Sequence, residues 1–318
     1  MSIDLLQGMP VLVTGGAGFI GSHLTRKLVE VGANVMVMDN LSNGSMDNLR
    51  GLEQKIGILT GDIRSAEDCA RAMKDRVAVF HLAALGSVPK SVEQPLLYNE
   101  VNITGTLTVL EAARKAGVRR VVYSASSAAY GDTPVLPKVE TMTPSPKSPY
   151  AVTKLVGEYY CRVFSEVYNL STVSLRYFNV FGPRQNPNSQ YAAVIPAFVS
   201  SLLKGVPPKI YGDGEQTRDF CFVNNVVKAN MLAATAERPL KGETVNIACG
   251  QRTSLNAMLA QMQRVLGTNV KPEYLAPRAG DVRDSLADVS AAKALIGYTA
   301  EVLFDQGLEV TVKAYAGR

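Results

Sequence analysis

Three side chains have the types and the spacing that proton transfer to or from an alcohol requires. Tyr150 and Lys154 stand four positions apart in the segment SPYAVTK, which is predicted to open a helix with Ser148 as its cap, so both side chains share one helix face. A free tyrosine titrates near about 10, but a neighbouring ammonium stabilises its phenolate as a base. Ser126, at the end of an upstream strand, could share the alcohol proton with Tyr150. Without further support, a tyrosine and a lysine at this spacing are more often a packed ring and a solvated amine.

A glycine-rich turn near the amino terminus is typical of a dinucleotide site. The β-branched run Val11–Thr14 leads into Gly15, Gly18 and Gly21, which permit a tight turn and close approach of the backbone to a pyrophosphate at a helix N-terminus. Asp39 ends the next run, 21 residues after Gly18, where its carboxylate can accept hydrogen bonds from an adenine-ribose diol and repel a 2′-phosphate. The pattern predicts NAD rather than NADP, against the alternative of a turn with a surface aspartate.

Alternating short apolar runs and helical stretches are predicted to carry these residues. Near-continuous apolar strands between helices indicate an α/β fold whose parallel sheet is covered on both faces. The predicted strands are Val11–Thr14, Asn34–Met38, Lys55–Leu59, Val77–Leu82, Val118–Ser124 and Ser171–Tyr177. The predicted helices are Gly18–Val31, Ala66–Ala72, Val101–Lys115 and Tyr150–Tyr168. After about Asn179, prolines and glycines punctuate shorter elements, and a second, smaller domain is predicted to begin there.

The composition excludes several classes of protein. With 318 residues, 47% hydrophobic and 19% charged, the chain is globular rather than disordered. Its net charge of +5 is scattered, which favours an anionic small molecule over nucleic acid. Four widely spaced cysteines and two histidines predict reduced thiols and no metal site. The first residues lack a signal-peptide pattern, and no apolar run approaches the length of about 18 residues that a membrane span needs. We therefore expect a cytoplasmic protein without a membrane partner.

The order of glycine loop, acidic residue, strand-end serine and Tyr-x-x-x-Lys resembles the extended short-chain dehydrogenase/reductase family. The resemblance extends over roughly residues 9–298. It implies a Rossmann-like doubly wound parallel sheet with a smaller C-terminal α/β substrate domain, a bound NAD, and catalytic roles for Ser126, Tyr150 and Lys154. The NAD-binding domain is expected at residues 1–180, with a contribution from about 217–240, and the UDP-sugar-binding domain at 181–318. The residues expected at the cofactor are Gly15, Gly18, Phe19, Ile20, Gly21, Asp39, Asn40, Asp62, Ile63, Leu82, Ala83, Ala84, Tyr150, Lys154 and Tyr177.

Downstream segments resemble the nucleotide-sugar epimerases and dehydratases within that family. They are RYFNVFGP, YGDG and RDF. Dehydratases of this group carry an Asp-Glu pair after the strand-end Ser or Thr, whereas Ser127 and Ala128 follow Ser126 here, so the resemblance implies epimerisation. It assigns Asn179, Arg218, Arg278 and Asp281 to the nucleoside diphosphate and its ribose, a role that suits the donor fork of arginine. The residues expected at the substrate are Gly86, Ser87, Ser126, Ser127, Tyr150, Asn179, Ala193, Val194, Tyr211, Arg218, Arg278, Asp281 and Ser285.

Two local features resemble UDP-N-acetylglucosamine 4-epimerases of bacterial surface-polysaccharide pathways. They are the segments HLAALGSVP and GPRQNP. Ala193 stands where galactose-type enzymes have Asn, and Ser285 stands where a bulky Tyr can limit the sugar pocket. A small residue at position 285 leaves room for an acetamido group, although on spacing alone it is an ordinary loop serine. His81 is interpreted as a structural histidine that borders the cofactor rather than as a base.

We therefore expect reversible C4 epimerisation between UDP-GlcNAc and UDP-GalNAc through a 4-keto sugar. The alternatives are a UDP-glucose 4-epimerase, an epimerase or decarboxylase of UDP-glucuronate, and a nucleotide sensor that keeps the fold without turnover. The resemblance also implies a homodimer, in which two helices corresponding to Val101–Leu110 and Leu155–Val167 form a four-helix bundle with the partner subunit.

Overall fold

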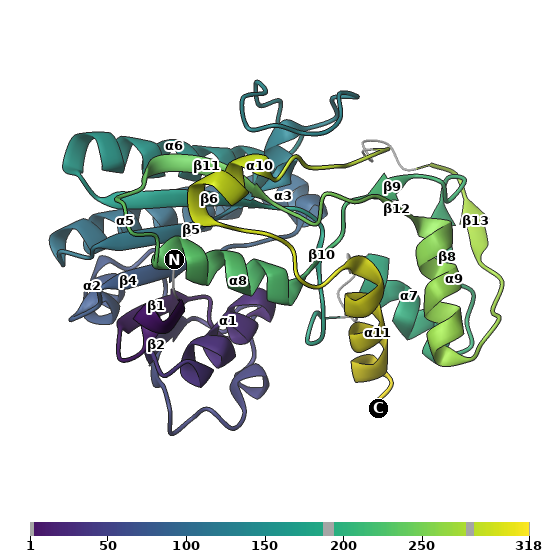
Figure 1. Cartoon of the computed structure of the whole chain (residues 1–318), viewed down its shortest axis with the longest axis horizontal. Helices are drawn as coiled ribbons and strands as arrows, with labels where there is room; N and C mark the ends of the chain where they lie inside the picture. The colour runs from purple at the N-terminus through teal and green to yellow at the C-terminus, as the bar shows by residue number, and fades with distance from the viewer. Residues whose placement is uncertain (1–2, 187–193, 278–282, 318) are drawn as a thin grey trace.

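A parallel sheet forms the larger part of the molecule (Figure 1). The computed structural model describes residues 3–186, 194–277 and 283–317. Within these residues the main sheet has seven strands in the order β11-β6-β5-β4-β1-β2-β3, and all neighbouring strands are parallel. The strands are β1 (Pro10–Thr14), β2 (Asn34–Asp39), β3 (Gly57–Thr60), β4 (Ala78–His81), β5 (Arg120–Ser126), β6 (Ser171–Tyr177) and β11 (Lys241–Ile247). This order confirms the predicted Rossmann-like, doubly wound fold.

Helices cover both faces of the sheet because its strands are apolar on both sides. Side chains alternate along a strand, so Val11 and Val13 of β1 pack in one core with Leu24. Leu12, between them, packs in the other core with Val109. One face carries α1 (Phe19–Glu30), α8 (Val223–Ala234) and α10 (Ser290–Ile296). The other face carries α2 (Ala66–Met73), α5 (Gly105–Lys115) and α6 (Pro149–Tyr168).

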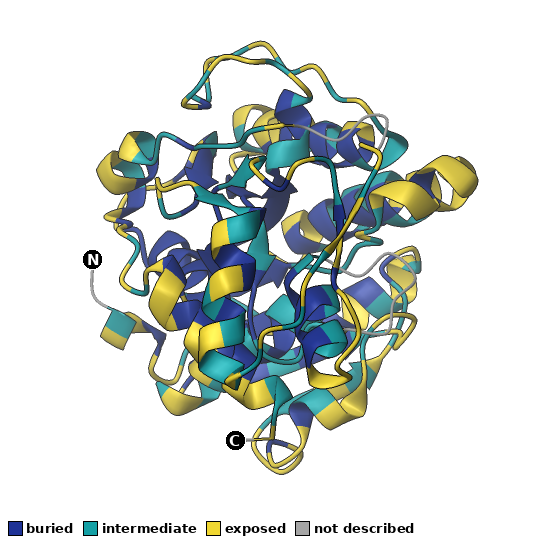
Figure 2. Cartoon of the chain, turned by 90° about the vertical axis from the view of Figure 1, so that its right-hand side faces the viewer, coloured by how far each residue is buried: buried dark blue, intermediate teal, exposed yellow. Residues whose placement is uncertain are grey.

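A smaller body lies beside the carboxyl ends of the strands, on the right in Figure 1. Phe181, Phe220, Phe222 and Phe304 meet in its core, where Phe220 and Phe304 are stacked with ring centroids 5.2 Å apart. Figure 2, seen from that side, shows the buried faces of its helices turned inward and the exposed faces outward. Its elements are β7 (Val180–Phe181), α7 (Val194–Leu203), β8 (Lys209–Tyr211), β9 (Thr217–Arg218), β10 (Cys221–Phe222), β12 (Thr253–Ser254), α9 (Leu255–Leu266), β13 (Glu273–Leu275) and α11 (Phe304–Tyr315).

Two elements from the second half of the chain belong to the main sheet by their packing. β11 extends the sheet beyond β6, with Ile247 opposite Tyr177. α8 is fixed by the buried Arg120 of β5, whose Nη1 donates to the carbonyl oxygens of Ala233 at 3.0 Å and Ala236 at 2.7 Å. A cation at the C-terminal end of a helix also interacts favourably with the helix dipole. The division at residue 180 remains a prediction.

The predicted strands and helices correspond to β1 to β6 and to α1, α2, α5 and α6, with differences at their ends. β5 continues to Ser126 instead of ending at Ser124. The helix predicted from Val101 begins as a π-helical turn, Glu100–Thr104, that leads into α5. β11 was not predicted, because its sequence KGETVNI breaks the apolar pattern. Short helices α3 (Val88–Glu93) and α4 (Pro95–Asn99) precede the π-helical turn. In the part of the chain that the structure describes, no helix has the length and apolar character that crossing a bilayer requires.

Candidate active site

Two adjoining cavities open at the carboxyl ends of β1 and β4, where the strand order reverses. Ligands of doubly wound sheets bind at this switch point. The smaller cavity has a volume of about 410 Å³ and the larger about 700 Å³. Phe19, Ile20, Leu82, Ala84 and Gly86 line both cavities, so the two form one continuous site.

The smaller cavity brings together most of the residues predicted to hold the cofactor. Gly15 has a φ of +71°, and a Cβ atom there would lie 2.7 Å from the backbone nitrogen of Ala83. A Cβ atom on Gly21 would collide with the carbonyl oxygen of Gly15. Only glycine fits at these positions, and α1 starts at this turn without a side-chain cap, so its first N–H groups face the cavity. The predicted cofactor residues on its wall are Gly15, Gly18, Phe19, Ile20, Gly21, Asp39, Asn40, Ile63, Leu82, Ala83 and Ala84.

Asp39 ends β2 on the wall of this cavity. Its Oδ2 accepts a hydrogen bond from the backbone nitrogen of Ala17 at 2.9 Å, and its Oδ1 accepts one from that of Leu41 at 2.8 Å. Each carboxylate oxygen has a further lone pair. The backbone thus holds the carboxylate in the orientation in which it can accept two more hydrogen bonds, as from a ribose diol.

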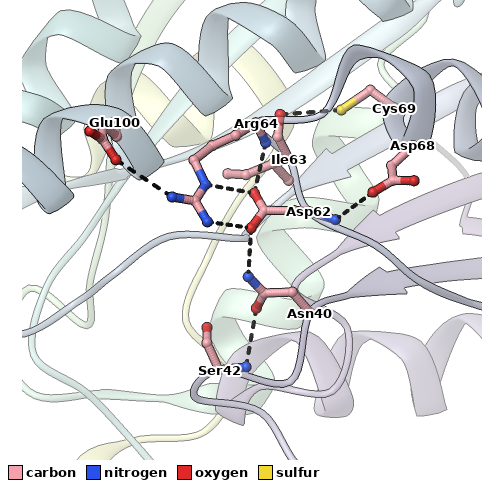
Figure 3. A network of polar contacts seen from close by, with 8 residues as sticks. All are labelled: Asn40, Ser42, Asp62, Ile63, Arg64, Asp68, Cys69 and Glu100. Carbon is pink, nitrogen blue, oxygen red and sulfur yellow. Dashed lines mark hydrogen bonds and ion pairs between the residues drawn. The ribbon is translucent and has the colours of Figure 1, made fainter.

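Asp62 follows β3 and takes part in a polar network at the rim (Figure 3). Nε and Nη2 of Arg64 donate to the two oxygens of Asp62 at 3.0 and 2.7 Å, and Nδ2 of Asn40 donates at 3.1 Å. Hydrogen bonding from Arg64 lowers the pKa of Asp62 to about 2. Ile63 and Arg64 line the cavity. The assignment of Asp62 to the cofactor stays a prediction, and its carboxylate orients Arg64 on the cavity wall.

The larger cavity holds the residues predicted for catalysis and several of those predicted for the substrate. Its wall includes Ser126, Ser127, Tyr150, Lys154, Tyr177, Asn179, Arg218 and Ser285. These residues come from the ends of β5, β6 and β9, the start of α6 and the segment before α10. The predicted catalytic and substrate residues therefore converge from distant parts of the chain.

Tyr150 lies in the first turn of α6. Ser148 caps the helix by accepting a hydrogen bond from the backbone nitrogen of Ala151 at 3.2 Å, and Pro149 occupies the first helical position, as predicted. Burial raises the pKa of Tyr150, and a hydrogen bond from Ser126 lowers it. The chain by itself therefore keeps the phenol protonated, and a positive charge from a ligand is needed to favour its phenolate.

Lys154 is almost completely buried, with 3% of its surface exposed. Its Nζ donates to the carbonyl oxygen of Ser124 at 2.6 Å and lies 5.0 Å from the ring centroid of Tyr123. Burial lowers the pKa of Lys154 to about 8, while the charge of Glu158 raises it. The ammonium form is therefore retained at neutral pH.

Glu158, one turn after Lys154 on α6, forms a buried ion pair. Both of its oxygens accept hydrogen bonds from Arg176, at 2.8 Å from Nε and 2.7 Å from Nη2. Arg176 lies over the ring of Tyr130, 4.6 Å from its centroid. The sequence shows that Glu158 follows Lys154 by four residues, but it does not show that Arg176 is the ion-pair partner of Glu158.

His81 is buried and structural. Its Nδ1 lies 2.8 Å from Oγ1 of Thr14, and its Nε2 lies 3.0 Å from Oγ1 of Thr106. Burial lowers its pKa to about 3, with a further contribution from the charge of Lys154. The imidazole is neutral and hydrogen-bonded at both nitrogens, which agrees with the structural interpretation.

Several residues predicted to contact the substrate lie away from the cavity walls or outside the described residues. Ser87 caps α3, Val194 begins α7 and Tyr211 ends β8; among the described residues none of the three is on the wall of either cavity. Ala193, Arg278 and Asp281 lie outside the described residues.

Other side chains on the cavity walls were not predicted. Lys138, Lys147 and Gln185 line the larger cavity, and Arg64 lines the smaller one. Lys138 and Lys147 belong to the long loop between β5 and α6, for which the sequence offered no motif. Arg64 directly follows Asp62 and Ile63, which were both predicted at the cofactor, and this neighbourhood in the sequence could have indicated Arg64 as well.

Comparison with known proteins places this site in a family. Residues 11–248 match the model of the NAD dependent epimerase/dehydratase family. The chain belongs to this family. A solved UDP-N-acetylglucosamine 4-epimerase from Methanobrevibacter ruminantium, in complex with UDP-N-acetylmuramic acid, is 42% identical with a TM-score of 0.93, over 98% of this chain and 99% of that one.

Two further relatives carry the name of a different sugar. The UDP-glucose 4-epimerase of Mycolicibacterium smegmatis is 38% identical, over 98% of this chain and 99% of the relative. The UDP-glucose 4-epimerase of Thermus thermophilus, solved with NAD, is 36% identical with a TM-score of 0.88, over 97% of this chain and 99% of that one. The chain is thus an NAD-dependent nucleotide-sugar epimerase by family, and its relatives differ in the sugar that they name.

The residues present fit NAD. The glycine turn leaves a cradle at Gly15 and Gly21 that a Cβ atom would fill, which suits a pyrophosphate at the start of α1. Asp39 stands fixed at the end of β2 for the adenine ribose. Lys154 and Tyr150, on the wall of the larger cavity, lie on the side where the nicotinamide half would enter.

Replacing Gly21 with alanine should weaken NAD binding by about tenfold or more, equivalent to about 1.4 kcal/mol, because the Cβ atom displaces the Gly15 carbonyl. NAD released from denatured protein, quantified against protein, measures this. Gly57→Ala is the control, since its Cβ atom would meet only the flexible end of Met36. Equal NAD content in Gly21→Ala and wild type would contradict the assignment of this cradle.

Proposed function

We propose that the chain interconverts UDP-GlcNAc and UDP-GalNAc by reversible C4 epimerisation. The observation that carries the proposal is that Tyr150, Ser126 and Lys154 share one wall of the larger cavity with the small residue Ser285. The 42% identity to a UDP-N-acetylglucosamine 4-epimerase over nearly the whole chain also supports it. A base, a hydroxyl partner and room beside the sugar are what such a reaction requires.

Tyr150 accepts the proton of the C4 hydroxyl, and Ser126, its hydrogen-bonding partner, orients that hydroxyl. Bound NAD supplies the acceptor for the C4 hydride and returns it to the opposite face of the sugar. Lys154, on the wall of the same cavity, adds its positive charge to that of the bound nicotinamide ring, and the two together favour the phenolate. When the ketone is reduced, Tyr150 returns the proton to the new C4 hydroxyl.

The 4-keto sugar has to turn over between the two transfers while its nucleotide end stays bound. Arg218 supplies a fork of donors on the cavity wall, which suits anchoring through phosphate oxygens. A volume of about 700 Å³ leaves space for the flat ring to rotate. Tight anchoring at one end and loose contacts at the other are the conditions for non-stereospecific return of the hydride.

UDP-glucose, UDP-glucuronate epimerisation and UDP-glucuronate decarboxylation are the alternative reactions on the same fold. A C6 carboxylate would need a cation nearby, and Lys138 and Lys147 line the larger cavity. Nζ of Lys138 donates to the carbonyl oxygens of Thr133 and Val135, so this ammonium already has partners, whereas Lys147 remains a candidate for such a carboxylate. The comparison of UDP-GlcNAc with UDP-glucuronate below therefore decides between the two substrates. The cytoplasmic location and a catalytic rather than sensing role are part of the same proposal.

Incubation of the holoenzyme with UDP-GlcNAc should yield UDP-GalNAc, and Tyr150→Phe should lower kcat by about 10²- to 10⁴-fold because it removes the proton acceptor. Chromatography of the UDP-sugars measures both, with UDP-glucose and UDP-glucuronate in parallel. NAD content should be unchanged in Tyr150→Phe. If no UDP-GalNAc is present at equilibrium, the proposed substrate is wrong. If none of the sugars produces the absorbance of bound NADH, the protein is a nucleotide sensor without turnover.

Ser285→Tyr should lower kcat/KM for UDP-GlcNAc about 10- to 100-fold more than for UDP-glucose, since a phenol ring fills the volume that the acetamido group needs. Initial rates on both sugars give this ratio. Ser290→Tyr, at an exposed position at the start of α10, is the matched control. An equal loss on both sugars would remove the size-selection role of position 285.

We also propose a homodimer that pairs the outer faces of α5 and α6. Tyr159, Val163 and Val167 of α6 are 55%, 45% and 61% exposed, and such a run of apolar side chains is typical of an interface. Val163→Glu should produce a monomer by light scattering, because a charge cannot be buried unpaired. Val206→Glu, at a similarly exposed position after α7, should not; a monomeric wild type would rule the dimer out.

A further inference from the structure

Behind the larger cavity, one buried carboxylate joins separate segments of the chain. Asp219 has 0% of its surface exposed. Its Oδ1 accepts a hydrogen bond from the backbone nitrogen of Cys249 at 3.0 Å, and its Oδ2 accepts from those of Gly250 and Ala287, each at 3.1 Å. It therefore connects the end of β9 with the segment after β11 and with residues 283–289, which we call the strap segment.

The backbone of Asp219 reaches the cavity wall from the same place. Its nitrogen donates to Oγ of Ser285 in the strap segment at 3.2 Å. Its carbonyl oxygen accepts from Nδ2 of Asn179 at 3.0 Å, and the same amide group donates to Oγ of Ser285 at 3.1 Å. Ser285, Asn179 and the adjacent Arg218 all line the cavity. The strap segment is also bonded directly to β9: the nitrogen of Ser285 donates to the carbonyl oxygen of Thr217 at 3.1 Å, and Nη1 of Arg218 donates to the carbonyl oxygen of Arg283 at 2.8 Å. The position of Ser285 relative to Arg218 thus depends on these bonds and on the segment that Asp219 anchors.

The strap segment has a second attachment on the opposite side. The backbone of Lys138 donates to the carbonyl oxygen of Leu286 at 2.7 Å and accepts from the nitrogen of Asp288 at 2.9 Å. The strap segment consequently spans from the loop before α6 to β9. The side chain of Asp284 also holds the strap segment, by accepting a hydrogen bond from the nitrogen of Thr217 at 3.1 Å. The carboxylate of Asp219 accepts from backbone N–H groups of two separate segments, so a substitution at Asp219 can remove these bonds and leave the others in place.

We propose that Asp219 is a positioning residue for the UDP-sugar pocket: its carboxylate completes the attachment of the strap segment that the direct bonds to β9 begin, and this sets the spacing between Ser285 and Arg218 that the bound UDP-sugar requires. The inference rests on the proposed function. It assigns Asp219 to substrate affinity and not to proton or hydride transfer, which take place at the wall formed by Tyr150 and Ser126. A charged acceptor suits this task because hydrogen bonds to an ionised group are stronger than neutral ones.

Asp219→Asn tests the assignment in the holoenzyme. The amide has one acceptor oxygen and places an NH₂ group against backbone N–H donors, which leaves at least one of them unpaired. We expect KM for the UDP-sugar and Kd for UDP, measured by calorimetry, each to rise about tenfold, with kcat changed less than about threefold and NAD content unchanged. Asp288→Asn, whose carboxylate accepts only from the nitrogen of Ser290 in its own turn, is the matched control and should behave as wild type.

The wild-type enzyme provides a second measurement that does not depend on a variant folding. Burial raises the pKa of Asp219 to about 6, against the effect of its backbone N–H donors. The titratable side chains that face it are Cys221, Cys249 and Tyr298, thiols and a phenol with ordinary pKa values of about 8.5 and about 10. Protonation of the carboxylate below about pH 6 should therefore raise wild-type KM between pH 7 and pH 5, while KM of Asp219→Asn stays flat.

Each outcome decides between the alternatives. A KM and a UDP Kd within twofold of wild type in Asp219→Asn, or a fall in kcat alone, would overturn the assignment. A loss of NAD together with UDP affinity would show a general structural role and overturn it as well. If Asp219→Asn does not fold, a flat wild-type KM from pH 7 to pH 5 overturns it. If wild type turns over no UDP-sugar, the proposed function fails, and UDP affinity alone still tests Asp219.

Discussion

The buried ammonium of Lys154 constrains the arrangement of the groups around it. Burial lowers its pKa to about 8, and the charge of Glu158 acts in the opposite direction. The carbonyl oxygen of Ser124 accepts a hydrogen bond from its Nζ at 2.6 Å. The carboxylate of Glu158, one turn further along the same buried helix face, therefore helps to keep this lysine charged at neutral pH.

That requirement extends into the sheet. Glu158 is itself buried and depends on the two hydrogen bonds from Arg176 of β6, because an unpaired charge in the interior is strongly unfavourable. His81 of β4 remains neutral because burial and the charge of Lys154 lower its pKa, and its two threonine partners satisfy the ring nitrogens. Charged and polar contacts thus link α6 to β4, β5 and β6, in addition to apolar packing. Tyr150 lies on this helix, so the same contacts hold it in place.

The local parts of the site were predictable and the long-range parts were not. The glycine turn, Asp39, the cap at Ser148 and the shared face of Tyr150 and Lys154 follow from spacings within one element, and the structure places them as expected. Asp219 contacts Ala287, 68 positions away, and no pattern in the sequence joins the two. Likewise, no pattern indicated that the carboxylate of Asp62 pairs with Arg64, two residues on. β11 was missed because an edge strand with glycine, glutamate and asparagine lacks the apolar run of a buried strand.

The position of β11 has a mechanical consequence. Adjacent strands β6 and β11 are separated in the chain by more than sixty residues, and the part of the smaller body from β7 to β10, which carries Arg218, lies between them in the chain. Cutting the chain after Tyr177 would leave the backbone of β6 unpaired at a sheet edge and strip α8 from the apolar face beneath it. The main sheet is therefore closed by polypeptide that has already passed through the smaller body, and the sheet cannot reach its final form before that part of the smaller body has been made.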